Sequence, residues 1–141
     1  MPLQTRPSPV ELLVADAYRR FGEHLYARGD FENAMQQFCH TIGIMSPSVV
    51  IRKFLDAQRL QYLTVYLEAL HARHLAHTGH ATLLLNCYTK LRNIEALDRF
   101  LRASDVPLDV PVALDVCRRG GCAAQAAYLA PVSYTHLRAH E

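Results

Sequence analysis

The stretch LYARGDFENAMQQF at residues 25–38 returns as CYTKLRNIEALDRF at 87–100 and, in weaker form, as CRRGGCAAQAAYLA at 117–130. The first two copies place an aromatic residue, an alanine, a large aliphatic residue and a second aromatic residue at the same offsets: Tyr26, Ala34, Met35 and Phe38, then Tyr88, Ala96, Leu97 and Phe100. The third copy keeps Ala126 and Ala127 of this frame. A phrase that recurs at fixed offsets indicates a repeat protein.

Each copy predicts two helices joined by a short turn. Gly29 occupies the turn of the first copy, and the second helix opens on Asp30 there and on Asn93 in the second copy. The side-chain oxygen of either residue can accept a hydrogen bond from the unpaired amides of the first helical turn. An alanine where the helices cross lets the backbones approach, and the aromatic residue four positions later fills the space beside it. The phrase therefore predicts an antiparallel helical hairpin.

A further copy of the second-helix frame lies between the first two, in the leucine-rich run from Leu60 to Leu67. The frame positions are then Ala34, Leu63, Ala96 and Ala126, separated by 29, 33 and 30 residues. Intervals in this range are typical of stacked supersecondary units that cannot bury their apolar faces alone. We therefore predict an all-α fold, an α-solenoid of stacked antiparallel helix pairs with about eight helices.

The helical pattern divides the chain into three parts. Residues 1–9 hold three prolines and are predicted to form an irregular leader, residues 10–130 carry the solenoid, and residues 131–141 break the pattern. We expect helices over about 10–26, 31–42, 47–57, 60–76, 81–91, 93–103, 109–119 and 122–130. Gly79 is expected to end the fourth of these helices. The inward stripe of the first is expected to hold Leu13, Ala17, Phe21, His24 and Leu25.

The segment from Pro131 to Glu141 resembles a translated sequencing adapter, and the helical periodicity stops abruptly at its first residue. We interpret residues 131–141 as a non-native tail and assign them no function. A natural tail is the alternative.

The bulk composition predicts a folded, cytosolic protein. Half of the 141 residues are apolar, which suffices for a continuous core, and 15 Lys and Arg against 13 Asp and Glu leave a formal charge of +2. Charges of both signs are scattered along the chain, which argues against a dedicated polyanion-binding surface. No run approaches the roughly 18 apolar residues that span a bilayer, and the stretch from Met1 to Tyr18 lacks the features of a signal peptide.

The residues that could carry chemistry predict no enzyme. The four cysteines are irregularly spaced without a Cys-x-x-Cys pair, which favours reduced, packed thiols: Cys39, Cys87, Cys117 and Cys122. Cys39 and His40 are adjacent on a helix and point about 100° apart, which does not suit a nucleophile and its base. The sequence has no nucleophile elbow, phosphate loop, dinucleotide fingerprint or zinc-protease helix. We expect no catalytic residue and no cofactor.

Four histidines recur at a spacing of three: His71, His74, His77 and His80. On a helix each step of three residues turns the side chain back by about 60°, so two neighbours could share a metal ion but all four could not. We expect no metal site and interpret the ladder as a solvated helix end whose positive charge rises as the pH falls toward about 6.

Four strings resemble the clathrin-heavy-chain-repeat region of the vacuolar protein sorting-associated protein eleven family. They are FGEHLYARGDFENAMQQF at 21–38, TIG at 41–43, VIRKFLDAQR at 50–59 and TLLLNCYTK at 82–90. The last two strings are the specific part of the resemblance, which covers residues 16–130. The chain is similar to a fragment of a member of that family.

The resemblance implies a core scaffold subunit of the class C tethering complexes HOPS and CORVET, which join endosomes, lysosomes or vacuoles before membrane fusion. Its partners would be the other subunits of those complexes, with no small-molecule substrate. It would lie on the cytosolic face of the membrane and contact the membrane indirectly. The family's amino-terminal propeller and carboxy-terminal zinc-binding RING finger have no counterpart in this sequence. The resemblance therefore transfers neither zinc binding nor ubiquitin ligase activity.

An RNA-binding helical repeat is the alternative from another class, because residues 86–100 also resemble a pentatricopeptide phrase. Such proteins read one base per repeat, which requires a uniform period and equivalent polar positions. The intervals here vary and the charge is nearly balanced, so nucleic acid is not the expected partner. The residues that contact partner proteins cannot be assigned, because basic positions resemble solvated faces: Arg19, Arg52, Lys53 and Arg102.

Overall fold

A computed structural model of the protein describes residues 6–56 and 58–130. Its helices are α1 (Pro9–Ala27), α2 (Phe31–Cys39), α3 (Pro47–Phe54), α4 (Leu60–Ala72), α5 (Thr78–Leu91), α6 (Ile94–Arg102) and α7 (Val110–Arg119), and a further helical segment covers 123–130. The described residues include no β-strand. The prediction of an all-α fold with about eight helices is confirmed. The proposed tail, 131–141, lies outside the described residues.

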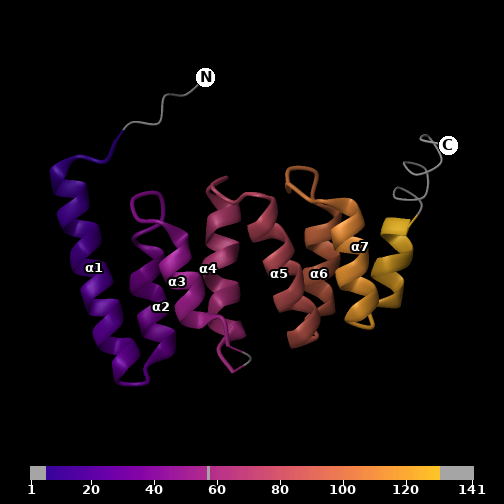
Figure 1. The fold of residues 1–141 in the computed structure, drawn as a ribbon, viewed down its shortest axis with the longest axis horizontal. Helices are drawn as coiled ribbons and strands as arrows, with labels where there is room; N and C mark the ends of the chain where they lie inside the picture. Colours follow the sequence, from indigo (N-terminus) through magenta and orange to yellow (C-terminus); the bar gives the residue numbers. More distant parts are fainter. Residues whose placement is uncertain (1–5, 57, 131–141) are drawn as a thin grey trace. The chain divides into compact units, whose positions relative to one another are not determined.

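The chain forms two compact units, Met1–Ala69 and Leu70–Glu141, and α4 runs from the first into the second. In the first unit α1 and α2 lie side by side and run in opposite directions (Figure 1). In the second unit α5 contacts both α6 and α7, and successive helices again alternate in direction (Figure 1). The hairpins that the repeated phrase predicts are therefore present in both units.

The frame positions of the repeat are all buried. Ala34, Leu63, Ala96 and Ala126 lie in the core, as do the aromatic residues Phe38 and Phe100 that close the phrase. Small residues also occur on the partner helices. Gly22 of α1 meets Phe38 of α2, and Gly120 at the end of α7 meets Thr89 of α5. Small residues thus allow close approach of α1 to α2 and of α7 to α5, as ridges-into-grooves packing requires.

Four helix ends share one turn geometry. A residue with positive φ follows the helix, at Gly29, His74, Arg92 and Gly121. Its amide bonds the carbonyl three residues back, and the next amide bonds the carbonyl five residues before itself. These two bonds define the Schellman motif, which satisfies carbonyls at the helix end. After Gly29 and Arg92 the next residue, Asp30 or Asn93, already caps the following helix.

The position of the turn shifts by one residue between the two strongest copies. Eight residues separate Tyr26 from Ala34 and Tyr88 from Ala96. Within that constant spacing, Ala34 is four residues after its N-cap and Ala96 is three residues after its N-cap. The spacing between the tyrosine and the alanine is therefore the same in both copies, whereas the position of the N-cap residue between them differs by one residue.

The predicted inward stripe of α1 is wrong. Leu13 and Phe21 are 71% and 51% exposed, whereas Ala15 and Gly22 are buried against neighbouring elements. The physical reason is that α1 has two apolar sides, and the side with the smaller residues allows α2 to approach closely. Sequence periodicity identified the more hydrophobic side, which faces solvent here.

Several predicted helix boundaries are also corrected. α1 begins at Pro9 because Ser8 and Glu11 form a capping box, so the leader is shorter than 1–9. α2 ends at Cys39 and α3 at Phe54, both earlier than expected. α4 ends at Ala72 rather than near residue 76, and Gly79 lies inside the first turn of α5 instead of ending α4. His74 adopts a left-handed conformation there and turns the chain.

The cysteines are free thiols, with Cys87, Cys117 and Cys122 buried and Cys39 half-buried. Burial raises the pKa of Cys39 and of Cys117 to about 11, which keeps both thiols protonated near neutral pH. Within the described ranges, none of the helices combines the length and hydropathy that crossing a bilayer requires.

Candidate interaction surfaces

The four histidines of the ladder lie on different elements. His71 is in α4, His74 in the turn that follows, His77 at the N-cap of α5 and His80 in the first turn of α5. They do not form one solvated helix end, and that interpretation is wrong. In the part of the chain that the structure describes, no group of three or more His, Cys, Asp or Glu side chains could hold a metal ion.

His77 and His80 form a capping box in which both imidazoles act as acceptors. Nδ1 of His77 accepts from the amide of Gly79 at 3.0 Å, and Nδ1 of His80 accepts from the amide of His77 at 3.2 Å. The two rings stack with their centroids 3.7 Å apart. Both acceptor nitrogens must be unprotonated, so this cap requires neutral rings. Burial, and then the neighbouring His77 and His71, lower the pKa of His80.

Cys39 and His40 do not form a reactive pair. The ring of His40 stacks on Tyr18 with a centroid distance of 4.3 Å, which directs it along α1. The thiol of Cys39 lies near the phenol of Tyr66, which is fully buried. Burial, and secondly Cys39, raises the pKa of Tyr66. Its hydroxyl has no hydrogen-bond partner among the described residues.

The basic positions left unassigned by the sequence have local partners. Arg19 bonds Asp16 at 2.6 Å and Glu23 at 2.9 Å, and its hydrogen bond lowers the pKa of Asp16. The Nε of Arg52 donates to the carbonyl of Ser48 at 3.4 Å. Each of these two side chains bonds groups of its own helix, so little of its hydrogen-bonding capacity is left for a partner protein.

Two other basic side chains lie over aromatic rings. The guanidinium of Arg102 is 4.8 Å from the ring centre of Tyr128, and Nζ of Lys53 is 4.6 Å from that of Tyr26. Arg59 also lies over Tyr26, at 5.4 Å. The hydroxyl of Tyr26 donates to the carbonyl of Lys53 at 2.9 Å. The first contact joins α6 to the segment 123–130, and the second joins α3 to α1.

The string at 50–59 packs into an aromatic cluster. Phe54 is fully buried and makes edge-on contacts with four rings, those of Tyr26, Phe31, Phe38 and Tyr62. Arg59 covers Phe31 at 4.5 Å and so closes the cluster on its outer side. Phe54 of this string therefore serves the core, whereas Arg52, Leu55, Asp56 and Gln58 are exposed.

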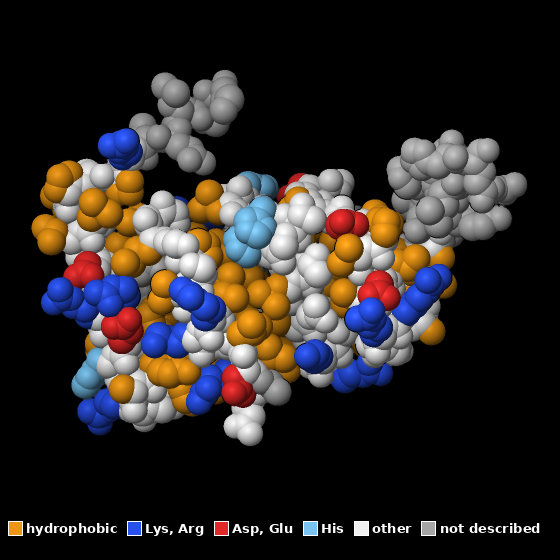
Figure 2. Space-filling view, in the orientation of Figure 1, with side chains coloured by type: hydrophobic (Ala, Val, Ile, Leu, Met, Phe, Trp, Pro, Cys, Tyr) orange, Lys and Arg blue, Asp and Glu red, His pale blue; other side chains and the backbone are white. Residues whose placement is uncertain are grey.

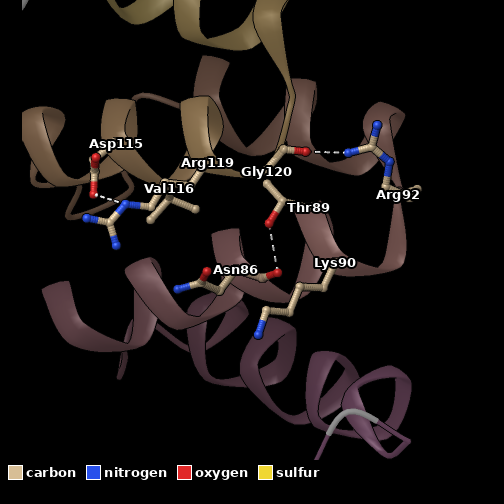
Figure 3. Close-up of a pocket in the computed structure, with 8 residues that line it drawn as sticks. All are labelled: Asn86, Thr89, Lys90, Arg92, Asp115, Val116, Arg119 and Gly120. Carbon is tan, nitrogen blue, oxygen red and sulfur yellow. Dashed lines mark hydrogen bonds and ion pairs between the residues drawn. The ribbon is translucent and has the colours of Figure 1, made fainter.

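A hollow of about 440 Å³ opens between α5 and α7 (Figure 3). Its lining residues are Asn86, Thr89, Lys90, Arg92, Asp115, Val116, Arg119 and Gly120. Three are basic and one is acidic, so the hollow carries a formal excess of two positive charges. Thr89 and Val116 are buried and form the inner wall, and the charged residues stand at the rim.

Sequence reasoning did not single out this hollow. Asn86 and Lys90 are four residues apart on α5, and Asp115 and Arg119 are four residues apart on α7, so each pair lies on one helix face. Those two polar pairs were the features from which the sequence could have predicted the hollow. Their meeting depends on α5 packing against α7, which are not consecutive helices.

The exposed side of α1 carries several large apolar side chains. Val10, Leu13, Val14, Ala17 and Phe21 fall on one stripe, which lies roughly 130° around the helix from the side packed on α2. Hydrophobic side chains gather over the amino-terminal half of α1 (Figure 2). Exposed apolar side chains grouped on one side of a helix are typical of surfaces that another protein element covers.

A sequence model described as the PEP5/VPS11 clathrin repeat matches residues 26–139. The chain is 50% identical over 123 residues to a vacuolar protein sorting-associated protein 11 homolog of Dictyostelium discoideum, a match that covers 87% of this chain and 13% of the relative. The homolog of Arabidopsis thaliana is 48% identical over 126 residues, or 86% and 14% of the two chains. The human homolog is 48% identical over 120 residues, or 83% and 13%.

The chain spans 13% to 14% of the length of these relatives. The family model describes clathrin repeats, and these matches give no support to the pentatricopeptide alternative. Clathrin repeats are helical hairpins stacked into an α-solenoid, which is the fold class that the repeated phrase predicted. The chain therefore belongs to the PEP5/VPS11 clathrin repeat family.

Proposed function

We propose that this chain is a non-enzymatic scaffold segment of a membrane-tethering complex that acts in vesicle-mediated protein transport and membrane fusion. Its family and the vacuolar protein sorting names of its relatives support this proposal. The organelles are endosomes and lysosomes or vacuoles. The complexes are of the HOPS and CORVET type, whose other class C subunits are the protein partners.

The observation that carries the proposal is the second apolar side of α1. A helix that packs on one side and exposes Leu13 and Phe21 on another suits a position between two neighbours in a stacked array. The proposed mechanism is geometric, because stacked hairpins hold the binding sites for different partners at fixed separations. The segment acts on the cytosolic face of the membrane and contacts the membrane through the rest of the complex.

A chimera tests this function. In Dictyostelium cells that lack the homolog, a full-length homolog that carries residues 10–130 of this chain in place of its matching segment should restore delivery of vacuolar proteins. It should also co-purify with the other class C subunits. A chimera that is expressed normally but fails in both measurements would refute the proposal.

Two variants of α1 test whether its exposed stripe is the surface on which a neighbouring repeat stacks. Leu13→Lys with Phe21→Lys places two charges on the exposed stripe, and we expect the chimera to lose most of its co-purifying subunits because neighbouring repeats no longer stack. Leu12→Lys changes an exposed leucine on the same helix but outside the stripe, and should retain assembly. Full assembly by the double variant would show that the stripe is not a stacking surface.

A further inference from the structure

The hollow between α5 and α7 is held in place by a tight helix contact. A Cβ atom at Gly120 would come within 2.8 Å of Cβ of Thr89, so the end of α7 lies directly on α5. The hydroxyl of Thr89 donates to the carbonyl of Asn86 at 2.9 Å, which turns its methyl group toward Gly120. The wall of the hollow is therefore formed before any ligand arrives.

The cations around the hollow differ in whether they already bond another group of the protein. Arg92 donates to the carbonyl of Gly120 and so joins the turn after α5 to the end of α7. Arg119 pairs with Asp115 at 3.1 Å, but both side chains are largely exposed, so this pair is weak and exchangeable. Lys90 has neither a hydrogen bond nor an ion pair from its ammonium to any described residue. The available positive charge is thus that of Lys90 and Arg119.

Asn86 and Arg119 face the same open side of the hollow, from α5 and from α7 (Figure 3). Arg92 lies at the other end, beside Gly120 (Figure 3). A carboxylate that entered from the open side would meet the planar guanidinium of Arg119, which can bond both of its oxygens. The carboxamide of Asn86 adds a neutral donor, and Lys90 adds a point charge.

The apolar wall of the hollow favours a carboxylate on a peptide over a free phosphate. Asp115 stands at the rim and lowers the positive potential of the hollow without reversing it, because three cations line the same hollow. The carboxyl end of α5 also lies here, and its partial negative charge acts in the same direction. Val116 offers an apolar contact beside the cations, which suits a side chain next to the acidic residue of a peptide.

We propose that the hollow between α5 and α7 binds a short acidic and hydrophobic segment of a partner protein. One Glu or Asp carboxylate of that segment bonds Arg119, the charge of Lys90 on α5 attracts the acidic segment, and a neighbouring apolar side chain covers Val116. The site shares no residue with the α1 stripe that the proposed function uses, and it would bind its peptide in the isolated chain.

Binding of a defined peptide tests the proposal. The probe is a blocked peptide that alternates glutamate and leucine, and its control replaces each glutamate by glutamine. Amide chemical shifts of the 141-residue chain, recorded by NMR during titration, should change in a saturable way at Asn86, Lys90, Val116 and Arg119. The glutamine peptide should bind about tenfold more weakly or not at all, because a carboxamide offers no charge to the two cations.

Matched variants separate a site from general charge attraction. Lys90→Ala with Arg119→Ala removes two cations of the hollow, and we expect about a tenfold loss of affinity. Arg99→Ala with Arg118→Ala removes two exposed cations that do not line it, one of them adjacent to Arg119 in α7, and affinity should change less than about twofold. If circular dichroism shows that the first variant is unfolded, the Lys90→Gln and Arg119→Gln pair replaces it.

Four outcomes would overturn the proposal. They are an equal loss of affinity in both double variants, equal binding of the two peptides, absence of saturable shifts, and the same shifts with inorganic phosphate or a uridine oligonucleotide in place of the peptide. The assay needs no tethering complex, so its failure leaves the proposed scaffold function standing. Failure of the chimera would likewise leave the peptide site standing.

Discussion

The ring of Phe38 lies against Gly22, so closely that a Cβ atom at position 22 would come within 2.9 Å of Cε1 of that ring. Phe38 is the last aromatic residue of the repeated phrase and is fully buried. Gly22 precedes the phrase and supplies the space that the ring fills. The first hairpin therefore depends on a pair of residues of which the phrase contains only one.

Gly22→Val should destabilise the first hairpin by about 2 kcal/mol, because a buried ring must move to admit an isopropyl group. Ala17→Val is the control, since Ala17 lies on the exposed stripe of α1 and the change costs only about 0.5 kcal/mol of helix propensity. Urea unfolding followed by circular dichroism gives both values. Equal costs for the two variants would show that Gly22 is not a tight crossing.

Two tyrosine-to-phenylalanine substitutions should change the free energy of unfolding in opposite directions. Tyr66→Phe removes a buried hydroxyl that lacks a hydrogen-bond partner among the described residues, and we expect a gain of about 1 kcal/mol in the free energy of unfolding. Tyr26→Phe removes the 2.9 Å bond to the carbonyl of Lys53 and should cost about 1 kcal/mol. Denaturant midpoints measure both. A loss of stability in the Tyr66 variant would reveal a hydrogen bond to that hydroxyl.

The histidine cap of α5 should make stability depend on pH. The pKa of His80 lies below its ordinary value of 6.5, mainly through burial, so the folded chain binds this proton less readily than the unfolded chain. Its contribution to stability is therefore full above pH 6.5 and is lost as the pH falls from there toward the lowered pKa. Protonation also removes the acceptor at Nδ1 that bonds the amide of His77.

His80→Gln tests this dependence because glutamine at the same position keeps an acceptor for the cap but does not titrate. Unfolding free energies between about pH 8 and pH 5 should decline less steeply in the variant than in the parent chain. His24→Gln, at an exposed histidine of α1 that caps no helix, serves as the control. Superimposable curves for the parent chain and the His80 variant would rule out the cap as the cause.

His74→Gly should stabilise the second unit. His74 has a φ of 56°, and a left-handed conformation costs a residue with a Cβ atom about 1 kcal/mol that glycine avoids. The contact between Nδ1 of His74 and a carboxylate oxygen of Asp105 is exposed and 4.0 Å long, so its removal costs little. Arg28→Gly, at a right-handed residue with a φ of −84°, should instead lower the melting temperature. A drop in melting temperature for both variants would contradict the conformational argument.

Local chemistry explains what could be predicted from the sequence. Asp30, Asn93 and Asp109 each cap the helix that the sequence predicted, because a capping side chain bonds an amide only two or three residues away. The buried alanines were also predictable, since their spacing repeats. The cap of α5 was not, because His77 and His80 act as acceptors only when both rings are neutral.

Tertiary packing explains what could not be predicted. Phe21 and Leu13 formed the more hydrophobic stripe of α1, but periodicity does not state which stripe meets α2, and the close approach at Gly22 decided it. The hollow depends on Lys90 and Arg119, which are 29 residues apart in sequence. They come together only because α5 packs against α7.

The constant spacing of eight residues between Tyr26 and Ala34, repeated between Tyr88 and Ala96, limits where the chain can change in length. One residue inserted within that spacing would rotate the following helix by about 100° and carry the alanine away from its partner helix. Insertions and deletions in evolution should therefore accumulate in the connection at 103–109, between α6 and α7, and spare the tight turns.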